Sequence, residues 1–240
     1  MILTSEQYRL LSSYIGYGVV NKPLICFFGN ESGCAPMKID DYLPMFFKNL
    51  ETMKNNTLDD IYDLPVSSIF LQFIARLMLA IEHKDEKWFG ELTGPGKAFI
   101  NNYIMTRFSK EDTCVFNLRP LPRPTERVWP YENINEKEYY KNWNFLTKTS
   151  RSDEFKDLRM NIFKEKFAQL NETLIIGVGD KENKKAFFEK IYDCEFTQFS
   201  NFYYNSQHKI ILSNYFDFKH GIKLTGLQTL YRFIKSNQLV

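Results

Sequence analysis

Residues 24–33 decide the fold class, and they read LICFFGNESG. The first five are all apolar, as expected for a central strand that is buried on both faces, and Gly29 ends the run. Polar residues follow at once. In open α/β sheets the reactive groups collect at the carboxyl ends of the strands. We therefore expect residues 24–28 to form a strand and the loop after it to carry chemistry.

Strands and helices alternate along the rest of the chain. Apolar runs predict further strands at 113–118, 174–178, 202–204 and 210–212. Helical patterns lie at 4–15, 42–54, 66–83, 94–107, 153–170, 182–191 and 225–235, and Thr4 with Gln7 matches a capping box. This alternation is typical of an α/β three-layer sandwich, in which helices flank a central, mostly parallel sheet.

The chain is long enough for one substantial core. It has 240 residues, of which 44% are apolar, and this composition is typical of a globular domain. We expect a single domain over residues 1–240. Helical patterns follow one another without a strand between the first two strands, so we interpret about 40–90 as a helical elaboration of that domain.

Charge and cysteines limit the setting of the protein. The net charge is only +2, but residues 206–240 contain five basic residues against one acid. That segment offers phosphates a basic face, or it is an ordinary solvated helix face. The four cysteines are scattered without a C-x-x-C pair, which favours reduced thiols and a cytoplasmic location. The longest apolar stretch, 66–81, contains Gln72 and Arg76, so we expect no membrane segment.

The loop after residue 28 contains an amide and a carboxylate between two glycines. Asn30 and Glu31 stand between Gly29 and Gly33, and this composition suits a close backbone approach to a ligand. A P-loop is excluded because the lysine followed by serine or threonine is missing. The alternative is a tight turn in which Asn30 is left-handed and Glu31 faces water.

Two further loops combine polar and basic groups. Asn117 ends the second strand, and Arg119 and Arg123 follow it. A carboxamide can read a base edge and guanidinium groups suit phosphate, although a strand cap in a proline-stiffened loop is the alternative. After the last strand come Ser213, Asn214, Lys219 and His220. A lone histidine in such a loop is usually a solvated side chain.

Several segments of the chain read like the motifs of one family. They are GNESG at 29–33, GPGK at 94–97, FNLRPLPR at 116–123 and IIGVG at 175–179, and a last one falls near 214–216. In order and wording they resemble the uracil-DNA glycosylase superfamily, most closely its family 4 branch. The resemblance spans most of the chain. It implies an enzyme that flips a base out of DNA and cuts its N-glycosidic bond, leaving an abasic site.

The chemistry of that reaction assigns roles to the loop residues. Glu31, with Asn30 beside it, is expected to position or activate the water. Asn117 would read the flipped base, and Ser213, Asn214 or His220 would donate to it or clamp the flanking phosphates. Phe28 would stack on the base only if its ring faces the crevice. The DNA-binding residues are then Arg119, Arg123, Lys219 and His220.

Departures from the family pattern bear on cofactor and substrate. Serine replaces the proline of the first motif, and Asn214 replaces the histidine of the last motif unless His220 supplies it. No cysteine quartet matches the family 4 iron–sulfur site, so we expect no cofactor and no metal. Uracil and a bulky modified cytosine of phage DNA both remain candidate bases, and the second would make the protein part of antiviral defence. DNA is the expected partner, with no obligate protein partner.

Two other readings stay open. The first is a glycosylase-fold module that binds nucleic acid without cutting it. The second is an unrelated α/β hydrolase or transferase, although the chain has no G-x-S-x-G, no metal-spaced histidine cluster and no G-x-G-x-x-G.

Overall fold

The computed structural model describes the chain except for residues 19–22, 34–36, 59–66, 125–127, 148–152, 171 and 220. His220 and Cys34, which the sequence singled out, lie outside the described residues. The other three cysteines, Cys26, Cys114 and Cys194, are buried and form no disulfide. Within the described part of the chain no helix is long and apolar enough to cross a membrane.

A mixed sheet forms the middle layer. Its order is β3-β1-β4-β2-β5-β8-β7-β6. The strands are β1 (Gly16–Tyr17), β2 (Ile25–Gly29), β3 (Thr57–Leu58), β4 (Thr113–Asn117), β5 (Leu174–Val178), β6 (Thr197–Phe199), β7 (Phe202–Asn205) and β8 (Ile210–Ser213). The central strands β4, β2, β5 and β8 are all parallel to one another, and antiparallel pairs occur only toward the two edges of the described sheet.

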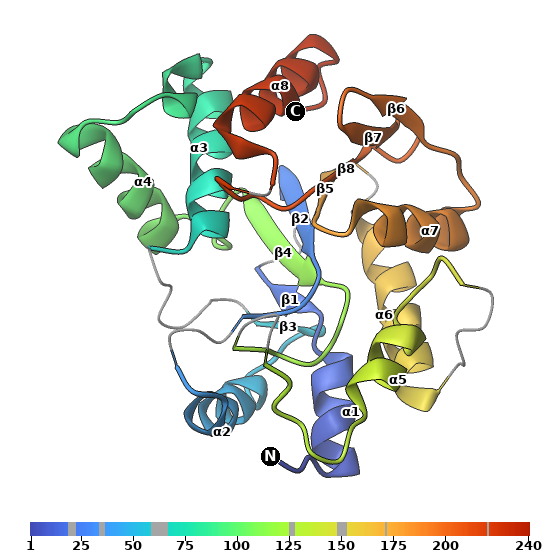
Figure 1. Cartoon of the computed structure of the whole chain (residues 1–240). Helices are drawn as coiled ribbons and strands as arrows, with labels where there is room; N and C mark the ends of the chain where they lie inside the picture. The colour runs from blue at the N-terminus through green and yellow to red at the C-terminus, as the bar shows by residue number, and fades with distance from the viewer. Residues whose placement is uncertain are drawn as a thin grey trace.

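Helices cover both faces of the sheet (Figure 1). They are α1 (Ser5–Ser13), α2 (Ile39–Leu50), α3 (Ile69–His83), the 3-10 turn η1 (Glu86–Phe89), α4 (Gly94–Thr106), α5 (Glu136–Asn142), α6 (Glu154–Gln169), α7 (Lys181–Tyr192) and α8 (Lys223–Ser236). One core lies between the sheet and α1, α2, α6 and α7. The other lies between the sheet and α3, α4 and α8. The predicted three-layer α/β sandwich is therefore confirmed.

Strand β2 shows why the two cores form. Its side chains alternate, so that Cys26 and Phe28 enter one core while Ile25 and Phe27 enter the other. All five residues of β2 are buried, as the continuous apolar run predicts. Because β4 and β5 pair with β2 on either side in parallel register, the polar residues that follow these strands meet at one edge of the sheet.

The sequence prediction differs from the structure at the short elements. The capping box of Thr4 and Gln7 is confirmed, but α1 ends at Ser13, two residues before the predicted end. Strand β3 interrupts the supposed run of helices and pairs with β1. Helices α2 and α3 pack on opposite faces of the sheet, so the region 40–90 contributes to both layers. Two-residue strands have no period to detect, which is why β1 and β3 escaped prediction.

Candidate functional site

A pocket of about 330 Å³ opens at the carboxyl ends of the central strands. It is lined by Gly29, Asn30, Glu31, Ser32, Gly33, Ser68, Phe70, Asn117, Arg123, Pro124, Val178, Tyr215 and Phe216. The lining comes from the ends of β2, β4 and β5, from the start of α3 and from the segment after β8. The structure thus brings together four residues that the sequence predicted for the site: Asn30, Glu31, Asn117 and Arg123.

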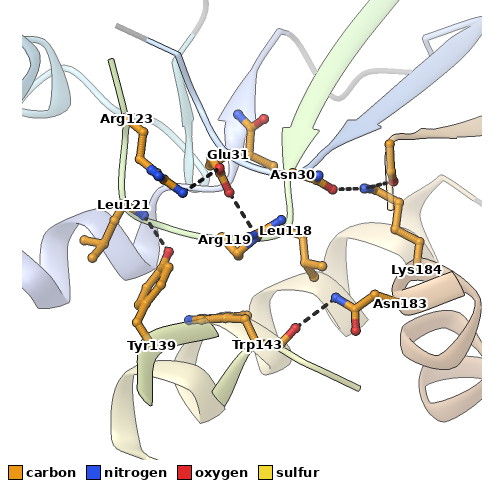
Figure 2. A network of polar contacts seen from close by, with 12 residues as sticks. Asn30, Glu31, Leu118, Arg119, Leu121, Arg123, Tyr139, Trp143, Asn183 and Lys184 are labelled. Atoms are coloured by element: carbon orange, nitrogen blue, oxygen red, sulfur yellow. Dashed lines mark hydrogen bonds and ion pairs between the residues drawn. The ribbon is translucent and has the colours of Figure 1, made fainter. Parts of the chain in front are cut away.

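Glu31 is held by two arginines (Figure 2). Arg119 Nε lies 2.9 Å from one carboxylate oxygen, and Arg123 Nη1 lies 3.9 Å from the other. The three side chains are only 13%, 10% and 5% exposed. Their guanidinium charges balance the carboxylate in a site with little water, where ion pairs are stronger than at a surface.

Aromatic rings cover the two arginines. Arg119 stacks on Tyr140 at 4.9 Å from the ring centre. Arg123 lies between Tyr140 and Trp129, at 5.3 and 5.7 Å. Both guanidinium groups are buried and contact Glu31, and Nη2 of Arg123 lies closer still, 3.6 Å, to Glu136. In the structure Arg119 is thus engaged with Glu31, and Arg123 with Glu31 and Glu136, while contact with DNA phosphates stays a prediction for both.

Asn30 is fixed from both ends of its carboxamide. Its Nδ2 donates to the hydroxyl of Tyr215 at 2.6 Å, and its Oδ1 accepts a hydrogen bond from Lys184 Nζ. Figure 2 shows Lys184 reaching Asn30 from α7. The tight turn that the sequence left open for Asn30 is not left-handed, since Asn30 is absent from the described residues with positive φ.

Lys184 is a site residue that sequence reasoning missed. It is fully buried, and its ammonium also donates to the Gly179 carbonyl at 2.5 Å. Burial, and after it the positive charge of Arg119, lowers the pKa of Lys184 from 10.5 to about 7. A usable signal existed: Lys184 precedes Phe187 and Phe188 by three and four residues, so it lies on the apolar face of its helix.

Asn117 occupies the end of β4, as predicted, and points into the pocket region. Its Nδ2 donates to Ser32 Oγ at 3.0 Å. Its Oδ1 packs on Gly29, where an added Cβ would lie only 2.9 Å away. Because Gly29 has no Cβ, the carboxamide of Asn117 fits against its backbone. The second N–H of this carboxamide and its oxygen are suited to hydrogen bonds with the edge of a base.

Arg159 of α6 supports the same loop from below. Its fully buried guanidinium donates to the carbonyl of Leu118 at 2.9 Å and also to those of Asn117 and Tyr14. These carbonyls lie at the end of β4 and just after α1, so the Arg159 side chain links these two segments. Burial lowers the pKa of Arg159 to about 10, which leaves it charged at neutral pH.

Four predicted residues lie away from this pocket. The ring of Phe28 is fully buried among Phe163, Phe167, Phe187 and Phe188. It does not face the crevice, so the condition for a stacking role is not met. Ser213 is buried, and its hydroxyl donates to the carbonyl of Asn214 at 2.9 Å. Asn214 lines a different pocket at the start of α8, and Lys219 is exposed.

Aromatic residues other than Phe28 line the pocket. Phe70, at the start of α3, and Tyr215 and Phe216, after β8, line the pocket. Tyr215 is 43% exposed, while Phe216 is buried and stacks on Phe73. Phe70 lies 6.1 Å from Phe216 between ring centres. These rings give the pocket aromatic surface beside its polar residues.

A larger pocket of about 480 Å³ lies near the chain start, between α1, α5 and α6. Its polar residues include Thr4, Asn135 and Asp153, and each of these caps a helix by accepting a backbone N–H. No buried ion pair adjoins it among the described residues. Because its polar groups are already engaged in capping, we take the smaller pocket around Glu31 as the candidate site.

The candidate site lacks the ligand set of a metal centre. Within the described ranges no group of three or more His, Cys, Asp or Glu side chains is placed to hold a metal ion.

Comparisons with protein-family models, with curated proteins and with solved structures find no match. Any functional assignment therefore rests on the motifs of the sequence and on the chemistry of the pocket.

Proposed function

We propose that the protein is a DNA glycosylase that flips an unusual or modified base into this pocket and hydrolyses its N-glycosidic bond. One observation carries the proposal: a carboxylate and two carboxamides, Glu31, Asn30 and Asn117, line one pocket at the ends of neighbouring parallel strands. The order of motifs that resembles the uracil-DNA glycosylase superfamily supports the same reading. At about 330 Å³ the pocket lies in the lower part of the size range of ligand sites.

The proposed reaction needs one anion and several hydrogen-bond donors. The bond between C1′ and the base nitrogen breaks, and the base leaves with the bonding electrons. A water oxygen then bonds to C1′, and its proton goes to solvent or to the base. Glu31 is the one carboxylate among the described lining residues. It is placed to orient the water and to face the positive charge that develops on the sugar.

The other lining residues would hold the base. Asn117 offers a donor and an acceptor from a carboxamide whose position is fixed by Ser32. Phe70 and Tyr215 offer rings on which a flipped base can stack, which offsets part of the cost of leaving the duplex. Lys219 and Lys223, near the start of α8, are exposed and are proposed phosphate contacts.

The base itself follows from neither the sequence nor the pocket. Uracil and a phage-type modified cytosine both stay within the proposal, and the second would assign the protein to antiviral defence. No cofactor is needed for the hydrolysis as written. DNA is the proposed partner.

Free-base mass spectrometry tests the proposal. The purified protein is incubated with ordinary genomic DNA, with uracil-containing DNA and with phage DNA that carries modified cytosines. We expect release of one base and appearance of abasic sites, lost in Glu31→Gln and slowed but still measurable in Asn30→Ala. Glu91→Gln is the matched control, because Glu91 is exposed and outside the pocket, and it should retain full release.

One observation favours a second function, a module that binds nucleic acid without cutting it. Glu31 is engaged with two arginines, an arrangement that also suits a purely structural carboxylate. The same experiment separates the two functions. A binder retains its affinity for DNA but releases no base from any of the three substrates, and Glu31→Gln then changes neither result.

A further inference from the structure

Lys184 buries an ammonium group without a carboxylate partner. No ion pair involves Lys184 in the part of the chain that the structure describes, and its acceptors are Asn30 Oδ1 and the Gly179 carbonyl. A buried charge is costly unless hydrogen bonds compensate for it. The two acceptors are therefore central to keeping the lysine protonated, and one of them belongs to a pocket residue.

The far end of the same carboxamide is held by Tyr215, so three side chains form a row from α7 to the segment after β8. Gly179 supports this row twice. Its carbonyl accepts from Lys184, and its bare Cα lies under the ring of Tyr215, where a Cβ would be 2.6 Å from the ring. The φ of +79° at Gly179 is one that other residues rarely adopt.

The protonation state of Lys184 decides which way the Asn30 carboxamide can lie. An ammonium has three donors and no acceptor. If the Asn30 carboxamide were flipped, its N–H group would face the ammonium of Lys184. Both groups are hydrogen-bond donors, so this orientation is unfavourable while Lys184 is protonated. A neutral amine has a lone pair that can accept from the N–H, so the flipped orientation is then tolerated. The Tyr215 hydroxyl can donate or accept and does not distinguish the two orientations.

We propose that Lys184 is a positioning residue that locks the Asn30 carboxamide with its oxygen away from the ligand, so that Asn30 offers the ligand an N–H donor. The catalytic consequence rests on the proposed glycosylase function. Asn30 would donate to an acceptor atom of the departing base, and the water would be left to Glu31. The proposal thereby narrows the substrates to bases that carry a hydrogen-bond acceptor where the Asn30 N–H donates.

The lock should respond to pH near neutrality. Burial, and after it the charge of Arg119, lowers the pKa of Lys184 to about 7, while Asp180 and Glu31 oppose that shift. These groups face Lys184 from α7 and from the loops after β4 and β2, and Tyr215 contacts it only through Asn30. From pH 6.5 to 8.5 the protonated fraction falls about 25-fold for a pKa of 7. Base release should fall with it, by no more than that factor.

Nuclear magnetic resonance tests the lock without any ligand. The full chain is labelled with ¹⁵N-asparagine, and the Asn30 side-chain amide is assigned by its disappearance in Asn30→Asp. We expect this amide to shift between pH 6 and 8.5 with a midpoint near 7, and the shift to vanish in Lys184→Met. Lys185→Met is the matched control, since Lys185 pairs with Glu189 at 2.5 Å, and it should titrate like the wild type.

Single-turnover base release then tests the catalytic half, with uracil-containing duplex and phage DNA as probes. Lys184→Met should be at least tenfold slower at pH 6.5 and should lose the fall above pH 7. In an Asn30→Ala background it should have no further effect. If Lys184→Met does not fold, Tyr215→Phe tests the row of Lys184, Asn30 and Tyr215 instead. This substitution removes the hydroxyl that accepts from Asn30 Nδ2. The titration midpoint of the Asn30 amide should stay unchanged, because Lys184 is still present.

The outcomes separate the two proposals. An Asn30 amide that does not titrate, or that titrates equally in Lys184→Met, overturns the lock. An equal slowing by Lys184→Met with and without Asn30 overturns its action through Asn30. A titrating amide in a protein that releases no base from either DNA supports the lock and overturns the glycosylase function.

Discussion

Replacing Lys184 by methionine is expected to remove a pH-dependent part of the protein's stability. The unfolded lysine holds its proton up to its ordinary pKa of 10.5, whereas the folded one releases it near 7. Between these values the unfolded chain binds one proton more than the folded chain, so the free energy of unfolding rises with pH. Below pH 6 both states are protonated and Lys184 adds no slope.

The size of the effect follows from the pKa difference. One pH unit corresponds to about 1.4 kcal/mol once the folded lysine is deprotonated. Across the midpoint, from pH 6 to 8.5, the gain is about 2 kcal/mol. Methionine has a similar length and no charge, so the variant should fold and lack this gain. At pH 6 it should be at least as stable as the wild type, because it buries no ammonium.

Urea unfolding of both proteins at pH 6, 7, 7.75 and 8.5 measures the difference. Lys156, whose pKa burial lowers to about 8, and every other titrating group are common to both proteins and cancel in that difference. We expect the wild type to gain on the variant by about 2 kcal/mol across this pH range. A difference that stays constant within about 0.5 kcal/mol would refute the reasoning, since the folded lysine would then keep its proton.

Four further substitutions distinguish residues that support the site from residues that contact a base. Arg159→Met should lower the free energy of unfolding by about 3 kcal/mol, because six buried backbone carbonyls lose this donor. Urea titration checks this against exposed Arg9→Met, and an equal effect of the two substitutions would contradict it. Gly29→Ala should slow base release at least tenfold by displacing the Asn117 carboxamide, while Gly94→Ala, which meets nothing within 4 Å, should not. Phe28→Ala should cost about 3–5 kcal/mol of stability, whereas Phe70→Ala should mainly weaken DNA binding in a fluorescence titration, and the reverse pattern would restore Phe28 as the stacking residue.

The sequence predicted those parts of the fold that depend on local patterns. The apolar runs at β2, β4, β5 and β8 are each buried along their whole length, because a strand covered on both faces needs apolar residues at every position. Since these strands are parallel, their carboxyl ends share an edge, and Asn30, Glu31 and Asn117 meet there. Their meeting could be predicted before any coordinates.

The support of the site could not be predicted in this way, because it depends on contacts between distant segments. Lys184 reaches Asn30 across 154 positions of the chain, and Arg159 reaches Tyr14 across 145. In sequence Arg159 reads as a charge on a solvated helix, whereas the apolar neighbours of Lys184 on its helix indicate burial but not its contact with Asn30. The carboxylate partners of the arginines after β4 were missed for a related reason: guanidinium groups suit phosphate and carboxylate equally well, and the sequence does not show that Glu31 and Glu136 lie beside them.

The charges around the pocket are unequal, and this bears on which half of the proposed reaction the protein assists. Arg119, Arg123 and Lys184 lie beside or behind the pocket, with Glu31 as the only carboxylate among the described lining residues. Glu136, 3.6 Å from Arg123, and Asp180 near Lys184 offset part of this charge from outside the pocket lining. With Lys184 protonated, the groups nearest the pocket then give a positive field. Such a field stabilises negative charge on a departing base and opposes positive charge on the sugar. We thus expect the protein to act mainly on the leaving base, while Glu31 and the phosphates of the DNA balance the charge on the sugar.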